Sequence, residues 1–349
     1  PLTGQLASIS GPDGVGLAFG YDGRLPTSLT WSGPVSGSVA FGYDNDFMMT
    51  SETVNGGQLA AFGYDVDNLL TGAGDLAVMR DASTGLLSSS TLHNTQQAYG
   101  YSTLGELSSM LATANAATLL DISYTRDALG RITQKVETVG GVTTTYDYSY
   151  DLAGRLEQVK EDGLVASTYT FDANGNRLTR VTQGGTTAAT YDAQDRLLTY
   201  GTLSYTYTAN GELATKHDSA SLQTTTYAYD VFGNLRSATL PDGRFVEYLV
   251  DGVNRRVQKR VDGLVERSWL YSDQLRVVAE LDAVGAVVSR FVYAGKPNVP
   301  EYMVKGGVTY RLLHDHLGSV RLVVDALTGA VAQQLDYDEF GRVLSDSSP

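Results

Sequence analysis

Apolar and polar residues alternate with a period of two along much of the chain. Between residues 142 and 150, the even positions carry Val, Thr and three Tyr, whereas the odd positions carry two Thr, Asp and Ser. Residues 203–207 repeat this alternation. Because successive side chains of a β-strand point to opposite faces, the pattern predicts antiparallel strands with one half-buried face.

Two kinds of turn separate these strands. Tight turns are marked by Asp-Gly or Gly-Gly pairs, which supply the positive φ angles of a two-residue hairpin. They stand at Gly140-Gly141, Asp162-Gly163, Gly184-Gly185, Asp242-Gly243 and Asp262-Gly263. Turns of either kind fall every 8 to 12 residues, which predicts about 30 strands.

The second kind of turn is a loop that repeats at steps of about 21 residues, the mark of a repeat architecture. Fuller copies begin at Tyr150-Asp151, Phe171-Asp172, Tyr229-Asp230 and Tyr337-Asp338, and degenerate copies begin at Tyr21, Tyr43, Tyr64 and Tyr191. We expect Asp to accept hydrogen bonds from backbone N–H groups two or three residues on, and Gly to adopt a left-handed conformation. These structural loop residues are Tyr150, Asp151, Gly154, Arg155, Leu156, Asp172, Gly175, Tyr229, Asp230 and Gly233.

Two segments are ambiguous. Leu107, Met110 and Leu111 have helical spacing, but residues 101–124 are about one repeat long, so we expect two strands with a turn near Asn115. After the loop at Asp151, the apolar residues Leu156 and Val159 stand three apart and break the alternation. A β-bulge would explain this spacing.

Composition excludes several classes of protein. The 349 residues carry a formal charge of −14, which argues against a nucleic-acid-binding surface. The absence of Cys excludes disulfides and thiol nucleophiles, and no apolar run reaches the length of a membrane span. Because the chain begins with Pro1, we expect a fragment or a processed product.

Few residues suggest chemistry. His314 and His316 could form a metal pair, but no further ligand stands nearby, and Asp65-x-Asp67 lacks the Gly and Glu of a calcium loop. The basic cluster at Arg255, Arg256, Lys259 and Arg260 is interpreted as a solvated face. No nucleophile or phosphate-binding motif stands out, so we expect no enzyme, no catalytic residue, no metal and no cofactor.

The Tyr-Asp-x-x-Gly-Arg-Leu loops resemble the YD repeat of the RHS (rearrangement hotspot) proteins. The end of the chain resembles the RHS-associated core segment. This core motif comprises His314, Asp315, His316, Gly318, Arg321, Tyr337, Asp338 and Gly341. The resemblance divides the chain into a repeat array at 1–305 and a core segment at 306–349.

The resemblance implies an all-β antiparallel hairpin array that forms a curved, spiralling sheet or part of a hollow shell, as in insecticidal toxin complexes and teneurins. In a bacterial polymorphic toxin, such a secreted or cell-surface shell encloses or presents a C-terminal toxin cargo, which this chain lacks. No Asp-Pro-x-Gly stretch follows the core motif, so self-cleavage is not expected. Expected partners are the cargo, the remaining shell and, through edge strands, a second copy, with no nucleic acid. The alternative is an adhesion module that binds carbohydrate through exposed Tyr rings.

Overall fold

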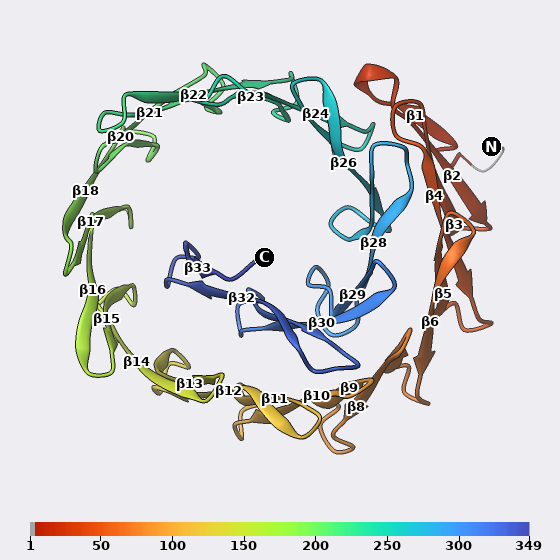
Figure 1. The fold of residues 1–349 in the computed structure, drawn as a ribbon, viewed down its shortest axis with the longest axis horizontal. Coiled ribbons are helices and arrows are strands. Elements are labelled where there is room, and N and C mark those ends of the chain that lie inside the picture. Colours follow the sequence, from red (N-terminus) through yellow and green to blue (C-terminus); the bar gives the residue numbers. More distant parts are fainter. Residues whose placement is uncertain (1–3, 349) are drawn as a thin grey trace. The chain divides into compact units, whose positions relative to one another are not determined.

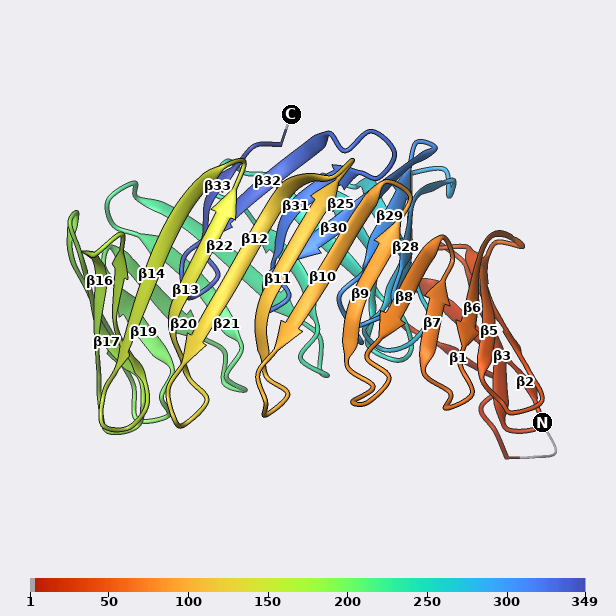
Figure 2. The ribbon, with the colours of Figure 1, turned by 90° about the horizontal axis from the view of Figure 1, so that it is seen from below.

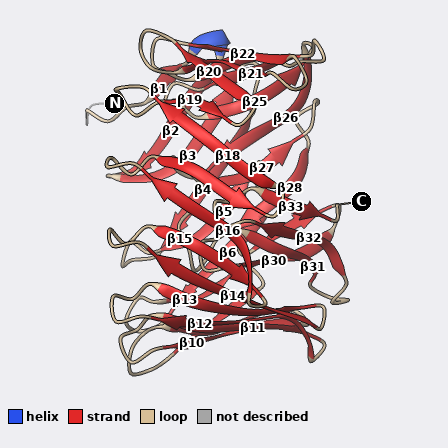
Figure 3. Ribbon diagram, turned by 90° about the vertical axis from the view of Figure 1, so that its left-hand side faces the viewer, coloured by secondary structure: helices blue, strands red, loops and turns tan. Residues whose placement is uncertain are grey.

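The structure, a computed structural model, describes residues 4–348, apart from the side chains of residues 58 and 59. Within that range every regular element is a strand, except the 3-10 helix η1 (Pro12–Gly14) (Figure 3). The 33 described strands form one unclosed sheet. Its described strand pairs are antiparallel, as in β12–β13 and β13–β14. The predicted all-β hairpin array is therefore confirmed.

The first half of the chain runs from β1 to β18. These strands, red to green in Figure 1, are β1 (Ser8–Ser10), β2 (Gly16–Asp22), β3 (Leu25–Ser32), β4 (Gly37–Tyr43), β5 (Met49–Val54), β6 (Gly57–Tyr64), β7 (Leu70–Ala73), β8 (Leu76–Arg80), β9 (Leu87–Leu92), β10 (Thr95–Tyr101), β11 (Leu107–Ala114), β12 (Ala117–Arg126), β13 (Ile132–Val139), β14 (Val142–Tyr150), β15 (Leu156–Glu161), β16 (Leu164–Phe171), β17 (Arg177–Thr182) and β18 (Gly185–Tyr191).

The second half continues the same pattern. Its strands are β19 (Leu197–Tyr200), β20 (Leu203–Tyr207), β21 (Leu213–Asp218), β22 (Gln223–Tyr229), β23 (Leu235–Thr239), β24 (Phe245–Val250), β25 (Arg256–Val261), β26 (Leu264–Tyr271), β27 (Val277–Leu281), β28 (Val287–Val292), β29 (Tyr302–Lys305), β30 (Val308–His314), β31 (Val320–Asp325), β32 (Val331–Tyr337) and β33 (Val343–Asp346).

The ambiguous segment at residues 107–114 is strand β11, which turns into β12 through Asn115 and Ala116, both at positive φ. The expected bulge is also present. Tyr150 pairs with Leu156, whereas Ser149 pairs with Gln158, so one residue of β15 has no partner opposite it. This shift places Leu156 and Val159 on the same face of the sheet.

The chain falls into two compact units. Unit 1 comprises Pro1–Tyr99, Ala112–Ala117 and Glu247–Pro349, and unit 2 comprises Gly100–Leu111 and Thr118–Val246. The expected boundary between an array at 1–305 and a core segment at 306–349 stays a prediction.

Unit 1 has two packed layers. We call its strands within residues 8–99 the N-terminal layer and those within residues 247–346 the C-terminal layer. In one apolar cluster, Leu17 and Trp31 of the N-terminal layer pack with Val257 and Leu270 of the C-terminal layer. A second cluster joins Leu76 and its neighbours to strands β28 and β29. Figure 1 shows β26 and β28 beside β3 and β4.

Unit 2 is a single layer of antiparallel strands, of which β12, β13 and β14 lie side by side in Figure 2. Both apolar clusters found among residues 4–348 belong to unit 1. Unit 2 instead buries individual side chains within its sheet, such as Leu120, Ile122, Val159 and Tyr169.

Candidate functional site

The Tyr-Asp loop is held by its Asp. The Oδ1 atom of Asp151 accepts hydrogen bonds from the N–H groups of Ala153 and Arg155, both at 2.9 Å, and Oδ2 pairs with Arg155 Nε at 2.7 Å. The second N–H lies four residues after Asp151, not three as expected, because the N–H of Gly154 already donates to the Asp151 carbonyl at 2.9 Å. Gly154 has a φ of 81°, which favours glycine.

The fuller loop copies share this geometry, but the predicted copy at Tyr21-Asp22 does not, because Asp22 pairs with Leu25 and leaves a two-residue hairpin turn between β2 and β3. In the loops at Asp172 and Asp230, an Asn side chain replaces the Arg and donates to the Asp carboxylate at 2.9 and 3.0 Å. Gly175 and Gly233 also have positive φ, and the side chains of Tyr229 and Leu156 are half-buried. That these residues carry the function of the repeat stays a prediction.

Neighbouring loops also contact each other, as the loops at Asp127, Asp151 and Asp172 show. The Tyr150 hydroxyl donates to the carbonyl of Ile132, the residue after the preceding loop, at 2.6 Å. The Arg131 guanidinium of that loop lies 4.6 Å from the Tyr150 ring centroid. In the same way Arg155 lies over Phe171 at 4.8 Å and donates to the Asp172 carbonyl at 2.7 Å. The repeated spacing of Tyr, Asp and Arg therefore links neighbouring hairpins.

The hydrogen bonds within each loop stabilise the charged form of its Asp. Hydrogen bonds from the Arg155 backbone and side chain hold the pKa of Asp151 below its usual value. The Asn176 side chain does the same for the pKa of Asp172. In the related loop at Asp81, hydrogen bonds from Ser83 and Thr84 lower the pKa of the Asp to about 2.

The core motif lies in unit 1, around the end of β30. His314 is buried, and burial, together with Lys296 and Arg311, lowers its pKa to about 3, so the ring is neutral at neutral pH. Asp315 orders the following loop by accepting the N–H groups of Leu317 and Ser319, both at 2.9 Å, and Gly318 has a φ of 92°. Since His314 is the last residue of β30 and His316 lies in the loop, the two residues are not on one strand.

The rest of the motif forms a further loop and an ion pair. Arg321 pairs with Asp336 at 2.6 Å. Asp338 accepts the N–H of Arg342 at 2.9 Å, Gly341 has a φ of 82°, and Tyr337 is half-buried. No group of three His, Cys, Asp or Glu side chains that could hold a metal occurs within residues 4–348.

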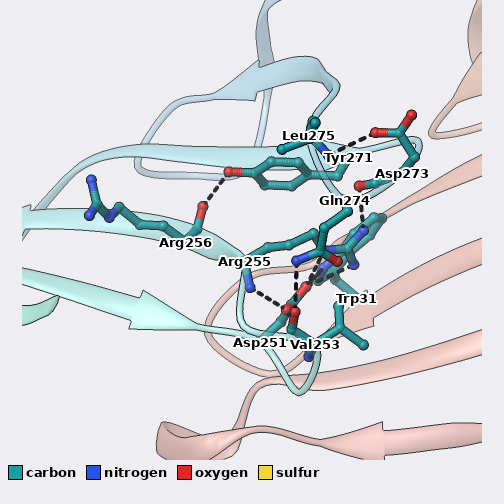
Figure 4. Close-up of polar contacts among 9 residues, drawn as sticks. All are labelled: Trp31, Asp251, Val253, Arg255, Arg256, Tyr271, Asp273, Gln274 and Leu275. Atoms are coloured by element: carbon teal, nitrogen blue, oxygen red, sulfur yellow. Dashed lines mark hydrogen bonds and ion pairs between the residues drawn. The ribbon is translucent and has the colours of Figure 1, made fainter. Parts of the chain in front are cut away.

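The seam between the two layers of unit 1 contains buried charges that the sequence analysis missed. The carboxylate of Asp251 pairs with Arg255 at 2.8 Å and accepts the indole N–H of Trp31, from the other layer, at 3.2 Å (Figure 4). The Arg255 guanidinium lies between the rings of Trp31 and Tyr271, at 5.0 and 5.2 Å from their centroids. The exposed fractions of the Arg255 and Asp251 side chains are 4% and 0%.

Two further buried arginines cross the same seam. Arg290 of β28 pairs with Glu52 of β5 and donates to the carbonyls of Val278 and Phe291, both at 2.8 Å. Arg311 of β30 donates to Ser90 at 2.7 Å and to Gln97 at 3.1 Å in the N-terminal layer, and it pairs with Glu301 of its own layer at 3.1 Å. Each arginine thus has a partner in the opposite layer.

The interpretation of residues 255–260 as a solvated face was wrong for part of the cluster. Arg255 is buried against Trp31, and the buried Gln258 donates to the Pro34 carbonyl at 3.2 Å. The signal was present in the sequence, because Asp251 and Arg255 have the same spacing as Asp151 and Arg155. In this copy Val250 occupies the position of the loop Tyr, so the copy is hard to recognise as a repeat.

Within residues 4–348, no helix is long and apolar enough to cross a membrane. The sequence matches the model of the family described as "Teneurin YD-shell" over residues 1–349. The chain belongs to the Teneurin YD-shell family. It is therefore a segment of a YD-type shell wall, and the predicted RHS/YD-repeat relationship is confirmed.

Relatives of this YD-shell segment are much longer proteins. The chain is 25% identical to Teneurin-3 of Danio rerio over 237 residues, which cover 65% of the chain and 8% of that protein. It is 28% identical over 193 residues to the tRNA3(Ser)-specific nuclease WapA of Bacillus spizizenii, which covers 54% of the chain and again 8% of the relative.

Solved structures share its fold. A TcdB2-TccC3-Cdc42 structure superposes with a TM-score of 0.67 at 14% identity, covering 99% of this chain and 21% of the other. The Photorhabdus luminescens Tc holotoxin pore gives a TM-score of 0.65 at 12% identity, covering 99% of this chain and 20% of the other. The likeness at this identity concerns the fold alone.

Proposed function

We propose that this YD-shell segment is a wall that separates a polypeptide cargo from solvent, in a protein of the polymorphic-toxin type. The observation that carries the proposal is the two-layered seam of unit 1, in which the sheet packs against another part of itself. Apolar packing between the N-terminal and C-terminal layers can hold such a sheet together as a wall. The Tc toxin structures named above support association with toxin and with further shell parts.

In this proposal the segment has no catalytic role. The nuclease activity in the name of WapA belongs to a protein of which this chain matches 8%. We place that kind of activity in the cargo and the wall outside the cell or at its surface, where a shell would deliver its contents. The edge strands β1 and β33 would pair with further wall or with a second copy.

Carbohydrate binding remains the alternative, but no observation favours it. The expectation required exposed Tyr rings that could stack on sugars. All 22 tyrosines lie in the described range, and each one is buried or half-buried.

Limited proteolysis of the polypeptide that carries this segment tests the proposal. If the segment is a wall, a fragment from outside residues 1–349 stays intact in the native protein and is digested once the seam is opened by Leu270→Asp. The matched control is Leu152→Asp, which places the charge on an exposed loop tip. Equal digestion of the cargo in the native protein and in the seam variant would contradict the proposal.

A further inference from the structure

The seam of unit 1 poses a problem of register. Repeat hairpins resemble one another at steps of two strands, so two stacked repeat layers can slide by one hairpin and still meet apolar side chains. Val, Leu and Ala side chains make up most of the two clusters. Apolar packing of this kind tolerates rearrangement better than it specifies a single arrangement.

The buried arginines are not repeated in this way. Their partners across the seam differ: the Trp31 ring for Arg255, Glu52 for Arg290, and Ser90 with Gln97 for Arg311. The arginines and their partners follow the same order along the two layers. A slide of one hairpin would therefore part every arginine from its partner in the opposite layer at once, although Arg255 would keep Asp251 and Arg311 would keep Glu301.

We propose that these three contacts, which we call the seam latches, select the register in which the C-terminal layer lies on the N-terminal layer. A slipped register leaves Arg290 and Glu52 buried without a counter-charge. At the other two latches it breaks the buried Trp31–Asp251 and Arg311–Ser90 hydrogen bonds, so it is penalised at each latch. Replacement of a whole buried pair by apolar residues removes that penalty without weakening the seam, because apolar residues of similar volume pack in its place. The latches thus supply specificity, whereas the apolar clusters supply the attraction.

Spin-label distances test this inference in the chain itself. The chain has no Cys, so labels can be placed on Thr30→Cys in β3 and Val284→Cys in the loop after β27, both exposed. The wild-type background should give one distance. Glu52→Leu/Arg290→Met should give a second distance, displaced by up to about 10 Å because a hairpin spans two strand spacings of about 4.8 Å.

The matched control is Arg321→Met/Asp336→Leu, which removes an Arg–Asp pair within the C-terminal layer and should leave one distance. The melting temperature of the latch variant should equal or exceed that of the wild type. A single, unshifted distance in the latch variant would overturn the inference, whether its melting temperature were unchanged or lowered. Should that double variant not fold, Trp31→Phe removes one latch donor and keeps an aromatic ring. A second distance in this variant would support the inference, and a single, unshifted distance would overturn it.

Discussion

Units 1 and 2 are built from the same hairpins but use the Tyr-bearing face differently. In β2 and β3 of unit 1, that face carries Leu17 opposite Trp31, and the C-terminal layer covers both. In unit 2, the corresponding face pairs Tyr146 with Lys135 and Tyr169 with Arg180. The repeat therefore specifies the sheet, whereas the residues on one face decide whether a second layer can pack on it.

The same difference appears in the loops. The Asp151–Arg155 pair of unit 2 and the Asp251–Arg255 pair of unit 1 have the same local geometry. The exposed fractions of the Asp and Arg side chains are 21% and 31% in unit 2 but 0% and 4% in unit 1. The Asp151–Arg155 pair orders a loop that water reaches, whereas the Asp251–Arg255 pair lies in the interface between two layers.

Breaking this pair in each unit should give the largest contrast. Asp251→Asn leaves Arg255 charged and buried without its counter-charge, which typically costs about 3–5 kcal/mol. Asp151→Asn should cost far less, because water and neighbouring carbonyls solvate Arg155. Chemical denaturation of both variants checks the comparison, and equal losses would refute the distinction between a seam contact and a loop contact.

The apolar seam predicts the next largest effect. Leu270→Ala, at a fully buried position, should lower the free energy of unfolding by about 2–5 kcal/mol. Leu152→Ala, at a fully exposed loop tip of unit 2, should stay within about 0.5 kcal/mol of the wild type. If Leu270→Ala unfolded with the same midpoint as Leu152→Ala, the two layers would not be packed as described.

A backbone test addresses unit 2 alone. Gly154→Val and Gly233→Val place a β-branched residue at φ of 81° and 80°, which should cost about 1–3 kcal/mol. Gly184→Val is the control, because Gly184 is not at positive φ and only the Thr182 hydroxyl, at 3.6 Å, would meet its Cβ. Thermal melting followed by circular dichroism distinguishes the variants, and unchanged melting of the first two would remove the backbone role of these glycines.

The smallest expected effect is a dependence on pH. Hydrogen bonds lower the pKa values of Asp127, Asp151, Asp172 and Asp192 in unit 2. A carboxyl whose pKa is lower in the folded state stabilises the fold above its unfolded pKa, and this contribution is lost as pH falls from about 4 through the folded pKa. The melting temperature should therefore fall below about pH 4, and Asp151→Asn/Asp192→Asn should reduce that slope. An identical acid response of the variant would exclude these loops as its source.

The sheet could be predicted from local residues, because strand alternation, turn glycines and the Tyr-Asp spacing each act within one or two hairpins. The β11–β12 turn at Asn115 and the bulge after Tyr150 were accessible for the same reason. The seam was not accessible, since Trp31 and Asp251 are 220 residues apart and no periodicity states which layer covers which. Arg255 resembles a solvated residue in the sequence because no local pattern places it against Trp31.

Residue-resolved hydrogen exchange of the intact chain tests the central claim most directly. If the C-terminal layer covers the N-terminal layer, the amides of β3–β5 and β26–β28 exchange slowly and open together, and Leu270→Ala speeds exchange in both sets. The strands β14–β22 of unit 2 should exchange faster and not respond to that substitution. Exchange in β3–β5 as fast as in unit 2, or a response to Leu270→Ala confined to β26 and its neighbours, would contradict the account.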